Sequence, residues 1–154
     1  MSRVAVIGAG SWGTALAAYS ANLGHETVIW ALEPEVAEEI NTHHTNSTFL
    51  PDAPLPESLR ATNDIADAVR GVRYIFSVVP TQFLRGVVKN MAPHLARDST
   101  IISASKGIEN ETLKTPTEIY TEEIGSGHAV AAFGGPSFAK EVVREHPTVV
   151  VTAA

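Results

Sequence analysis

The sequence predicts an α/β domain with a doubly wound, mostly parallel sheet and helices on both of its faces. Short apolar runs alternate with segments of 3.6-residue periodicity, an order typical of strands joined by crossover helices. The runs centred on residues 4–7, 75–79 and 149–151 lack polar–apolar alternation, so we expect strands that are buried on both faces. Several helical segments open with proline, threonine, serine or aspartate and end at glycine.

Each expected strand is rich in valine, isoleucine, alanine or aromatic residues, and most are followed by a helical pattern. The expected strands are RVAVIG (3–8), ETVIWA (26–31), RYIFSVV (73–79), STIISAS (99–105), HAVAAF (128–133) and PTVVVTA (147–153). The expected helices are 11–23, 34–42, 64–70, 81–91, 111–124 and 136–145. Segment 49–59, FLPDAPLPESL, contains three prolines and is predicted to be an ordered surface loop.

Length and composition indicate one globular domain. The chain has 154 residues, of which 44% are hydrophobic and 18% are charged, so it can bury a core without cross-links. It has no cysteine, which excludes disulfides and thiolate metal sites and fits a cytoplasmic location. The apolar run at the N-terminus is too short for a signal peptide, and no later run approaches a membrane span. A net charge of −6 argues against nucleic-acid binding.

Three glycines stand where the first strand should pass into the first helix. Gly8, Gly10 and Gly13 form the pattern G-x-G-x-x-G. In this setting the first glycine permits a tight turn, the second lets the backbone approach a pyrophosphate, and the third allows close helix–strand packing. The N–H groups at the helix start then hold negative charge without a lysine. The pattern predicts a dinucleotide site, although three glycines can also form a turn alone.

An acidic residue follows the second expected strand. Glu33 lies twenty positions after Gly13, where a carboxylate can accept hydrogen bonds from the ribose hydroxyls of an adenosine. A carboxylate there would repel a 2′-phosphate, so NAD is favoured over NADP. The alternative is a solvated glutamate at a helix start, beside Pro34.

Other strand ends also carry candidate ligand contacts. Pro80 and Phe83 follow the expected strand 73–79 and could line the nicotinamide side of a crevice, although Phe83 could equally be a core residue. Lys106 follows the strand 99–105 and could hold a phosphate or polarise a carbonyl, or be an ordinary surface lysine. In GGPSFAKEV, a helix opened by Ser137 would offer a second anion site or a plain cap.

Two further site types are not supported. His43 and His44 are adjacent, so their side chains do not converge, and no third ligand stands at a motif spacing; we expect no metal. Ser137 lacks the G-x-S-x-G context and the assigned base of a nucleophilic serine.

Taken in order, these motifs resemble the N-terminal half of NAD-dependent glycerol-3-phosphate dehydrogenases. The resemblance covers essentially the whole chain through GAGSWGTALA, VIWALEPEVAEEIN, FLPDAPLPESLRAT, SVVPTQFLR, SASKGIE and GGPSFAKEV. It implies a Rossmann fold and reversible hydride transfer between NADH and dihydroxyacetone phosphate. The product, sn-glycerol 3-phosphate, serves phospholipid synthesis and redox balance.

The resemblance also implies roles for residues of this chain. Lys106, Gly135 and Ser137 would face the substrate, with Lys106 orienting it, and Leu32 could pack on the adenine ring. With the residues already named, the expected cofactor contacts are Gly8, Gly10, Ser11, Trp12, Gly13, Leu32, Glu33, Pro80, Phe83, Lys106 and Ala139.

The chain departs from the family pattern in two ways. Bacterial relatives often carry arginines after the second strand, suited to a 2′-phosphate, whereas this chain has Leu32 and Glu33, which resembles NAD-preferring members. The family's acid/base lysine and its substrate-phosphate arginine belong to a helical C-terminal domain that is absent from residues 1–154. We therefore expect a dinucleotide-binding domain that binds NAD and turns over little or no substrate.

Two other functions stay open. One is half of another two-domain dehydrogenase with a ketopantoate-like or sugar-acid substrate, which the SASKGIE and GGPSFAKEV segments disfavour. The other is a stand-alone NAD-binding sensor, because fold alone does not determine function. The chain ends just after an apolar strand, which indicates part of a longer enzyme. If a missing half normally covers apolar surface, exposure of that surface would favour self-association, and a homodimer is one expected form.

Overall fold

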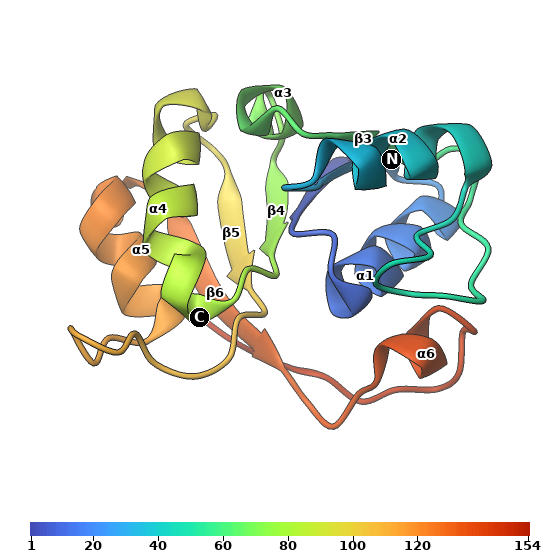
Figure 1. The fold of residues 1–154 in the computed structure, drawn as a ribbon. Coiled ribbons are helices and arrows are strands. Elements are labelled where there is room, and N and C mark those ends of the chain that lie inside the picture. Colours follow the sequence, from blue (N-terminus) through green and yellow to red (C-terminus); the bar gives the residue numbers. More distant parts are fainter.

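A seven-stranded sheet divides the molecule into two helical layers (Figure 1). The computed structural model describes residues 1–154. The strand order is β3-β2-β1-β4-β5-β6-β7, and every neighbouring pair is parallel except β6 with β7. The strands are β1 (Arg3–Ile7), β2 (Glu26–Trp30), β3 (Arg60–Thr62), β4 (Tyr74–Ser77), β5 (Thr100–Ser103), β6 (Ala129–Gly134) and β7 (Val151–Ala153). The predicted fold class, a doubly wound and mostly parallel α/β sheet of the Rossmann type, is confirmed.

The helices cover the two faces of the sheet in two groups. They are α1 (Ser11–Asn22), α2 (Pro34–His43), α3 (Ile65–Val69), α4 (Thr81–Met91), α5 (Pro116–Ile124) and the short α6 (Ala139–Val142). In Figure 1, α4 and α5 lie on one side of the strands, and α1 and α2 lie on the other. None of these helices combines the length and the apolarity that crossing a membrane requires.

The two faces carry different cores. On one face, Ala17, Ala18 and Ala21 of α1 pack with Val6 and Ile29 of the sheet, and these small side chains bring the helix close to the strands. On the opposite face the core is built from larger side chains of the strands and of α3, α4 and α5. Fully buried members of that core include Ile75, Leu84, Met91, Ile101, Ile119 and Tyr120. The small side chains of α1 therefore allow a close helix–sheet approach directly after the glycine pattern.

Gly8 and Gly13 are required by the geometry of this approach. Gly8 has a φ of +112°, which favours glycine. A Cβ atom on Gly13 would lie 1.9 Å from the carbonyl oxygen of Gly8. The first and third glycines of the pattern are thus fixed by the turn and by helix packing, as the sequence predicts.

Some predicted elements are shorter than expected. The helix expected over 111–124 begins at Pro116, because Thr115 and Glu118 form a capping box there. The helix expected over 136–145 is reduced to four residues, α6, and Phe138 is its N-cap.

The strand β3 was not predicted, because a three-residue run shows no periodicity. Its pairing with β2 defines it.

The C-terminal strand also differs from the prediction. The run 149–151 was expected to be buried on both faces, yet Val149 and Val151 are 69% and 64% exposed. The strand begins at Val151, is antiparallel to β6 and forms the edge of the sheet, so it pairs with only one neighbouring strand.

The proline-rich segment 49–59 is irregular as predicted, but it buries Leu50, Leu55 and Leu59.

The contrast between two glycines predicts a stability experiment. Gly13→Ala should lower the free energy of unfolding by about 2–3 kcal/mol, because the methyl group would overlap the Gly8 carbonyl. Gly10→Ala is the matched control: no atom lies within 4 Å of its Cβ position, and we expect a loss below about 1 kcal/mol. Urea unfolding followed by circular dichroism measures both. Equal destabilisation by the two variants would contradict this account of the packing.

Candidate functional site

A crevice opens at the carboxyl ends of β1 and β4, two adjacent strands whose following helices lie on opposite faces of the sheet. This is the switch point of a doubly wound sheet, where ligands of open α/β folds bind. The crevice has a volume of about 700 Å³. Six of the predicted cofactor contacts lie along its wall: Gly8, Gly10, Leu32, Glu33, Pro80 and Phe83.

The floor of the crevice is the glycine turn. Gly10 is the N-cap of α1, and no side chain caps the helix there, so the first N–H groups of the helix have no side-chain partner. The Cβ position of Gly10 faces open space, with no atom within 4 Å. A negatively charged group can therefore approach the backbone closely at this point.

Asn46 fixes the other side of the turn and was not predicted from the sequence. Its side chain is fully buried, and its Nδ2 donates to the carbonyl oxygen of Ala9 and to Thr14 Oγ1, each at 2.9 Å. Its Oδ1 accepts from the N–H of Phe49 at 3.1 Å. An asparagine in a polar loop gives no signal of this role, because the two partners of its Nδ2 lie more than thirty positions away.

Ser11 joins the same loop to the glycine turn. Its hydroxyl donates to the carbonyl oxygen of Phe49, and Phe49 itself lies against the crevice. The segment 46–50 therefore packs against the start of α1 and stabilises the backbone of the glycine turn.

The two ends of the crevice carry different chemistry. At the β2 end stand Leu32, which is 69% exposed, and Glu33, which is half-buried and makes no capping hydrogen bond to α2. At the β4 end stand Pro80 and Phe83, at the start of α4. Phe83 is 70% exposed, so the alternative that it is a core residue is wrong. One end presents a carboxylate, and the other presents an apolar wall.

Seven of the predicted site residues lie outside the crevice wall: Ser11, Trp12, Gly13, Lys106, Gly135, Ser137 and Ala139. Trp12 lines a separate apolar groove, described below, and Ala139 begins α6 and packs beside the small cluster of Ala15, Leu50, Ala53 and Val142. Gly135 and Ser137 lie between β6 and α6. A Cβ atom on Gly135 would approach the carbonyl oxygen of Val149 to 2.6 Å, so this glycine has a packing role of its own. The helix α6 begins at Ala139 and Phe138 is its N-cap, so the expectation that Ser137 opens this helix is wrong.

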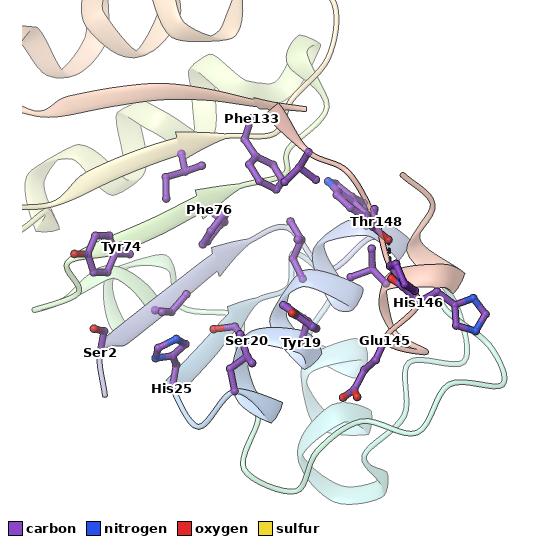
Figure 2. A pocket seen from close by; sticks show the side chains of 18 residues that line it. Ser2, Tyr19, Ser20, His25, Tyr74, Phe76, Phe133, Glu145, His146 and Thr148 are labelled. Carbon is purple, nitrogen blue, oxygen red and sulfur yellow. Dashed lines mark hydrogen bonds between the residues drawn. The ribbon is translucent and has the colours of Figure 1, made fainter. Parts of the chain in front are cut away.

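The second hollow has a volume of about 730 Å³ and lies between α1 and the strands β4 to β6 (Figure 2). Figure 2 shows Phe76 and Phe133 projecting from strands toward it; their rings meet edge to face at 5.8 Å. It contains neither the glycine turn nor Glu33, and its lining is largely apolar. The crevice is the smaller of the two hollows, but it is the one that contains the glycine turn at the uncapped start of α1, so we take it as the candidate functional site.

Lys106 is exposed at the carboxyl end of β5, next to β4, and lies outside the crevice wall. It belongs to an irregular segment, residues 105–115, which we call the lysine loop. Ser105 Oγ donates to the carbonyl oxygen of Val79 at 2.6 Å, and Thr81 Oγ1 donates to the carbonyl oxygen of Lys106 at 2.7 Å. The end of β4 and the start of α4 thus hold the loop at its first two residues.

A cluster of charges anchors the middle of the lysine loop. Arg85 of α4 binds the carboxylate of Glu109 through Nε at 3.0 Å and Nη2 at 2.7 Å. Its Nη1 contacts Glu122 and Glu123 of α5, and Lys114 also pairs with Glu122, at 2.6 Å. Hydrogen bonds from Arg85 and Thr112 lower the pKa of Glu109 to about 2, and the three carboxylates raise the pKa of Arg85.

The comparisons with known proteins agree with this geometry. The sequence model of one family, described as NAD-dependent glycerol-3-phosphate dehydrogenase N-terminus, matches residues 3–154. A glycerol-3-phosphate dehydrogenase [NAD(P)+] of Citrifermentans bemidjiense is 49% identical over 99% of the chain, which spans 46% of that relative. The chain therefore covers about half the length of the curated relatives it matches.

Solved structures give the same result. The crystal structure of glycerol-3-phosphate dehydrogenase from Coxiella burnetii has a TM-score of 0.91 and 33% identity, over 98% of this chain and 46% of that one. The Saccharomyces cerevisiae glycerol-3-phosphate dehydrogenase has a TM-score of 0.87 and 32% identity, over 98% of this chain and 46% of that one.

The low pKa of Glu109 predicts a pH-dependent stability. Because the folded-state pKa lies below its ordinary value of 4.5, the ion pair stabilises the fold above that value and is lost as the pH falls toward 2. Glu109→Gln should therefore lower the urea midpoint at pH 7, and the gap to the unsubstituted chain should narrow at pH 3. A gap of equal size at both pH values would show that the carboxylate charge is not what stabilises the loop.

Proposed function

The chain belongs to the family of NAD-dependent glycerol-3-phosphate dehydrogenases and matches its N-terminal, NAD(P)-binding part, and from this premise we propose that its crevice binds NAD for hydride exchange with dihydroxyacetone phosphate. The observation that carries the proposal is the crevice at the switch point between β1 and β4. Its floor is the glycine turn, and its two ends carry Glu33 and Phe83.

The residues of the crevice fit a dinucleotide. The open space above Gly10 accepts a pyrophosphate against the N–H groups at the start of α1. This arrangement holds an anion in a chain of net charge −6 without a basic side chain. In the proposed orientation, Leu32 packs against the adenine ring, and Pro80 and Phe83 flank the nicotinamide.

We assign the cofactor preference to Glu33. Its carboxylate makes no capping hydrogen bond in α2 and lies on the crevice wall, free to accept hydrogen bonds from the ribose hydroxyls. The same charge would repel a 2′-phosphate. The curated relatives carry the name NAD(P)+, which spans both cofactors, and the preference of this chain for NAD is our proposal.

Lys106 is the residue of this chain that we place against the substrate. A lysine at the carboxyl end of β5, beside the nicotinamide end of the crevice, would hold the substrate and polarise its carbonyl oxygen. Gly135 and Ser137, after β6, would complete the substrate side. Bound nicotinamide supplies the hydride, and the carbonyl oxygen takes up a proton.

We further propose that residues 1–154 bind the cofactor but do not complete turnover by themselves. The chain spans 46% of the length of its first relatives. The proton donor for the substrate oxygen would come from the remaining part of such an enzyme, and loss of a positioned donor alone lowers a rate by about 10²–10⁴-fold.

Calorimetric titration tests the cofactor site. NADH should bind the 154-residue chain, and Gly10→Val should abolish detectable binding, because its side chain would fill the space of the pyrophosphate. Gly127→Val is the control for a glycine-to-valine change, because Gly127 lies outside the crevice wall and no atom lies within 4 Å of its Cβ position. An assay of dihydroxyacetone phosphate reduction should show little or no turnover. Unchanged NADH affinity in Gly10→Val would overturn the assigned site.

Charge reversal at the β2 end tests the preference for NAD. Glu33→Arg should shift the affinity ratio toward NADPH by about tenfold or more, since an arginine makes a charge-assisted hydrogen bond to a 2′-phosphate. Glu35→Arg adds the same charge in the same helix turn, away from the crevice wall, and should leave the ratio nearly unchanged. Equal shifts in both variants would mean that general charge, and not Glu33, sets the preference.

A further inference from the structure

The first turn of α4 touches two parts of the site at once. Phe83 and the preceding Pro80 line the crevice, whereas Thr81, Gln82 and Arg85 contact the lysine loop. Since these residues belong to the N-cap and the first two turns of α4, one helix contacts both the apolar end of the crevice and the lysine loop.

Thr81 makes the contact nearest to Lys106. Its hydroxyl donates to the carbonyl oxygen of Lys106 itself at 2.7 Å, and the residue is only 4% exposed. Removal of the hydroxyl would leave this carbonyl oxygen without its side-chain donor.

Gln82 holds the next stretch of the loop with both ends of its amide. Its Nε2 donates to the carbonyl oxygen of Ile108 at 2.9 Å, and its Oε1 accepts from the N–H of Asn110 at 3.0 Å. The Gln82 side chain thus supplies hydrogen bonds to the backbone of this irregular segment, as a neighbouring strand would. Arg85 forms a bidentate ion pair with Glu109, which lies between Ile108 and Asn110 in the sequence.

The loop has few internal bonds that could fix Lys106 without α4. Its own backbone hydrogen bonds, from Glu109 N–H to the carbonyl of Lys114 and from Leu113 N–H to the carbonyl of Glu109, lie beyond Lys106. Gly107, the next residue, has a φ of +92°, a conformation that favours glycine. The position of Lys106 is therefore set by the end of β4 and the first turns of α4.

We propose that Thr81, Gln82 and Arg85 are positioning residues that hold Lys106 at a fixed position relative to Pro80 and Phe83. They fix the substrate lysine and the nicotinamide wall relative to each other through the first two turns of α4. This inference depends on the proposed function for the role of Lys106, but the mechanical link itself can be measured without substrate.

The experiment compares Thr81→Val, which keeps the shape of the side chain and removes the donor, with Thr81→Ser, which keeps the hydroxyl. Hydrogen exchange of the amides from Gly107 to Asn110 reports how firmly the loop is held. We expect exchange there to be about tenfold faster in Thr81→Val and within about twofold of the unsubstituted chain in Thr81→Ser. Calorimetry should give the same NADH affinity for all three proteins.

A second readout follows Lys106 directly. The chain has four lysines, so after reductive ¹³C-methylation their NMR signals can be assigned with Lys106→Arg. In the unsubstituted chain and in Thr81→Ser, glycerol 3-phosphate added to the NADH complex should shift the Lys106 signal. In Thr81→Val we expect about tenfold more glycerol 3-phosphate to be needed for the same shift.

The outcomes separate the two proposals. Failure of the unsubstituted chain to bind NADH would count against the proposed function, while the exchange data would still test the link. Normal exchange from Gly107 to Asn110 in Thr81→Val would overturn the link. If Thr81→Val and Thr81→Ser both bound NADH more weakly than the unsubstituted chain, Thr81 would support the fold generally and would not position Lys106.

Discussion

The close approach of α1 to the ends of β1 and β4 is the constraint on which the site depends. At Gly13 there is no room for a Cβ atom, because the carbonyl oxygen of Gly8 would lie 1.9 Å away. This contact brings the start of the helix to the switch point of the sheet. Gly10, the N-cap of the helix, then lies on the crevice wall and leaves the space in front of it open. The packing of α1 and the proposed pyrophosphate site thus depend on the same contact.

The sequence predicts the features that follow from local chemistry. Gly8 and Gly10 after β1, Glu33 after β2 and Phe83 after β4 line one crevice, because the carboxyl ends of parallel strands meet at one edge of the sheet. The same reasoning predicts the fold class and most strands. It succeeds because buried strands and glycine turns leave their pattern within a few consecutive residues.

Other features could not be predicted because their causes lie far apart in the chain. Asn46 acts through Ala9 and Thr14, and Thr81 acts through Lys106, twenty-five positions away. The short strand β3 exists only through its pairing with β2. The apolar composition of 149–151 suggested burial, yet its place at the antiparallel edge leaves it exposed. In each case tertiary position, and not local pattern, decides the outcome.

The two ends of the crevice belong to different halves of the sheet. Leu32 and Glu33 follow β2 on one side of the glycine turn, whereas Pro80, Phe83 and the helix that carries them follow β4 on the other. Glu33 makes no side-chain hydrogen bond or ion pair with α4 or with the lysine loop. In the proposed function, the fold therefore separates the residue that selects the cofactor from the residues at the reacting end, so that protein engineering could change the nucleotide preference without altering the substrate side.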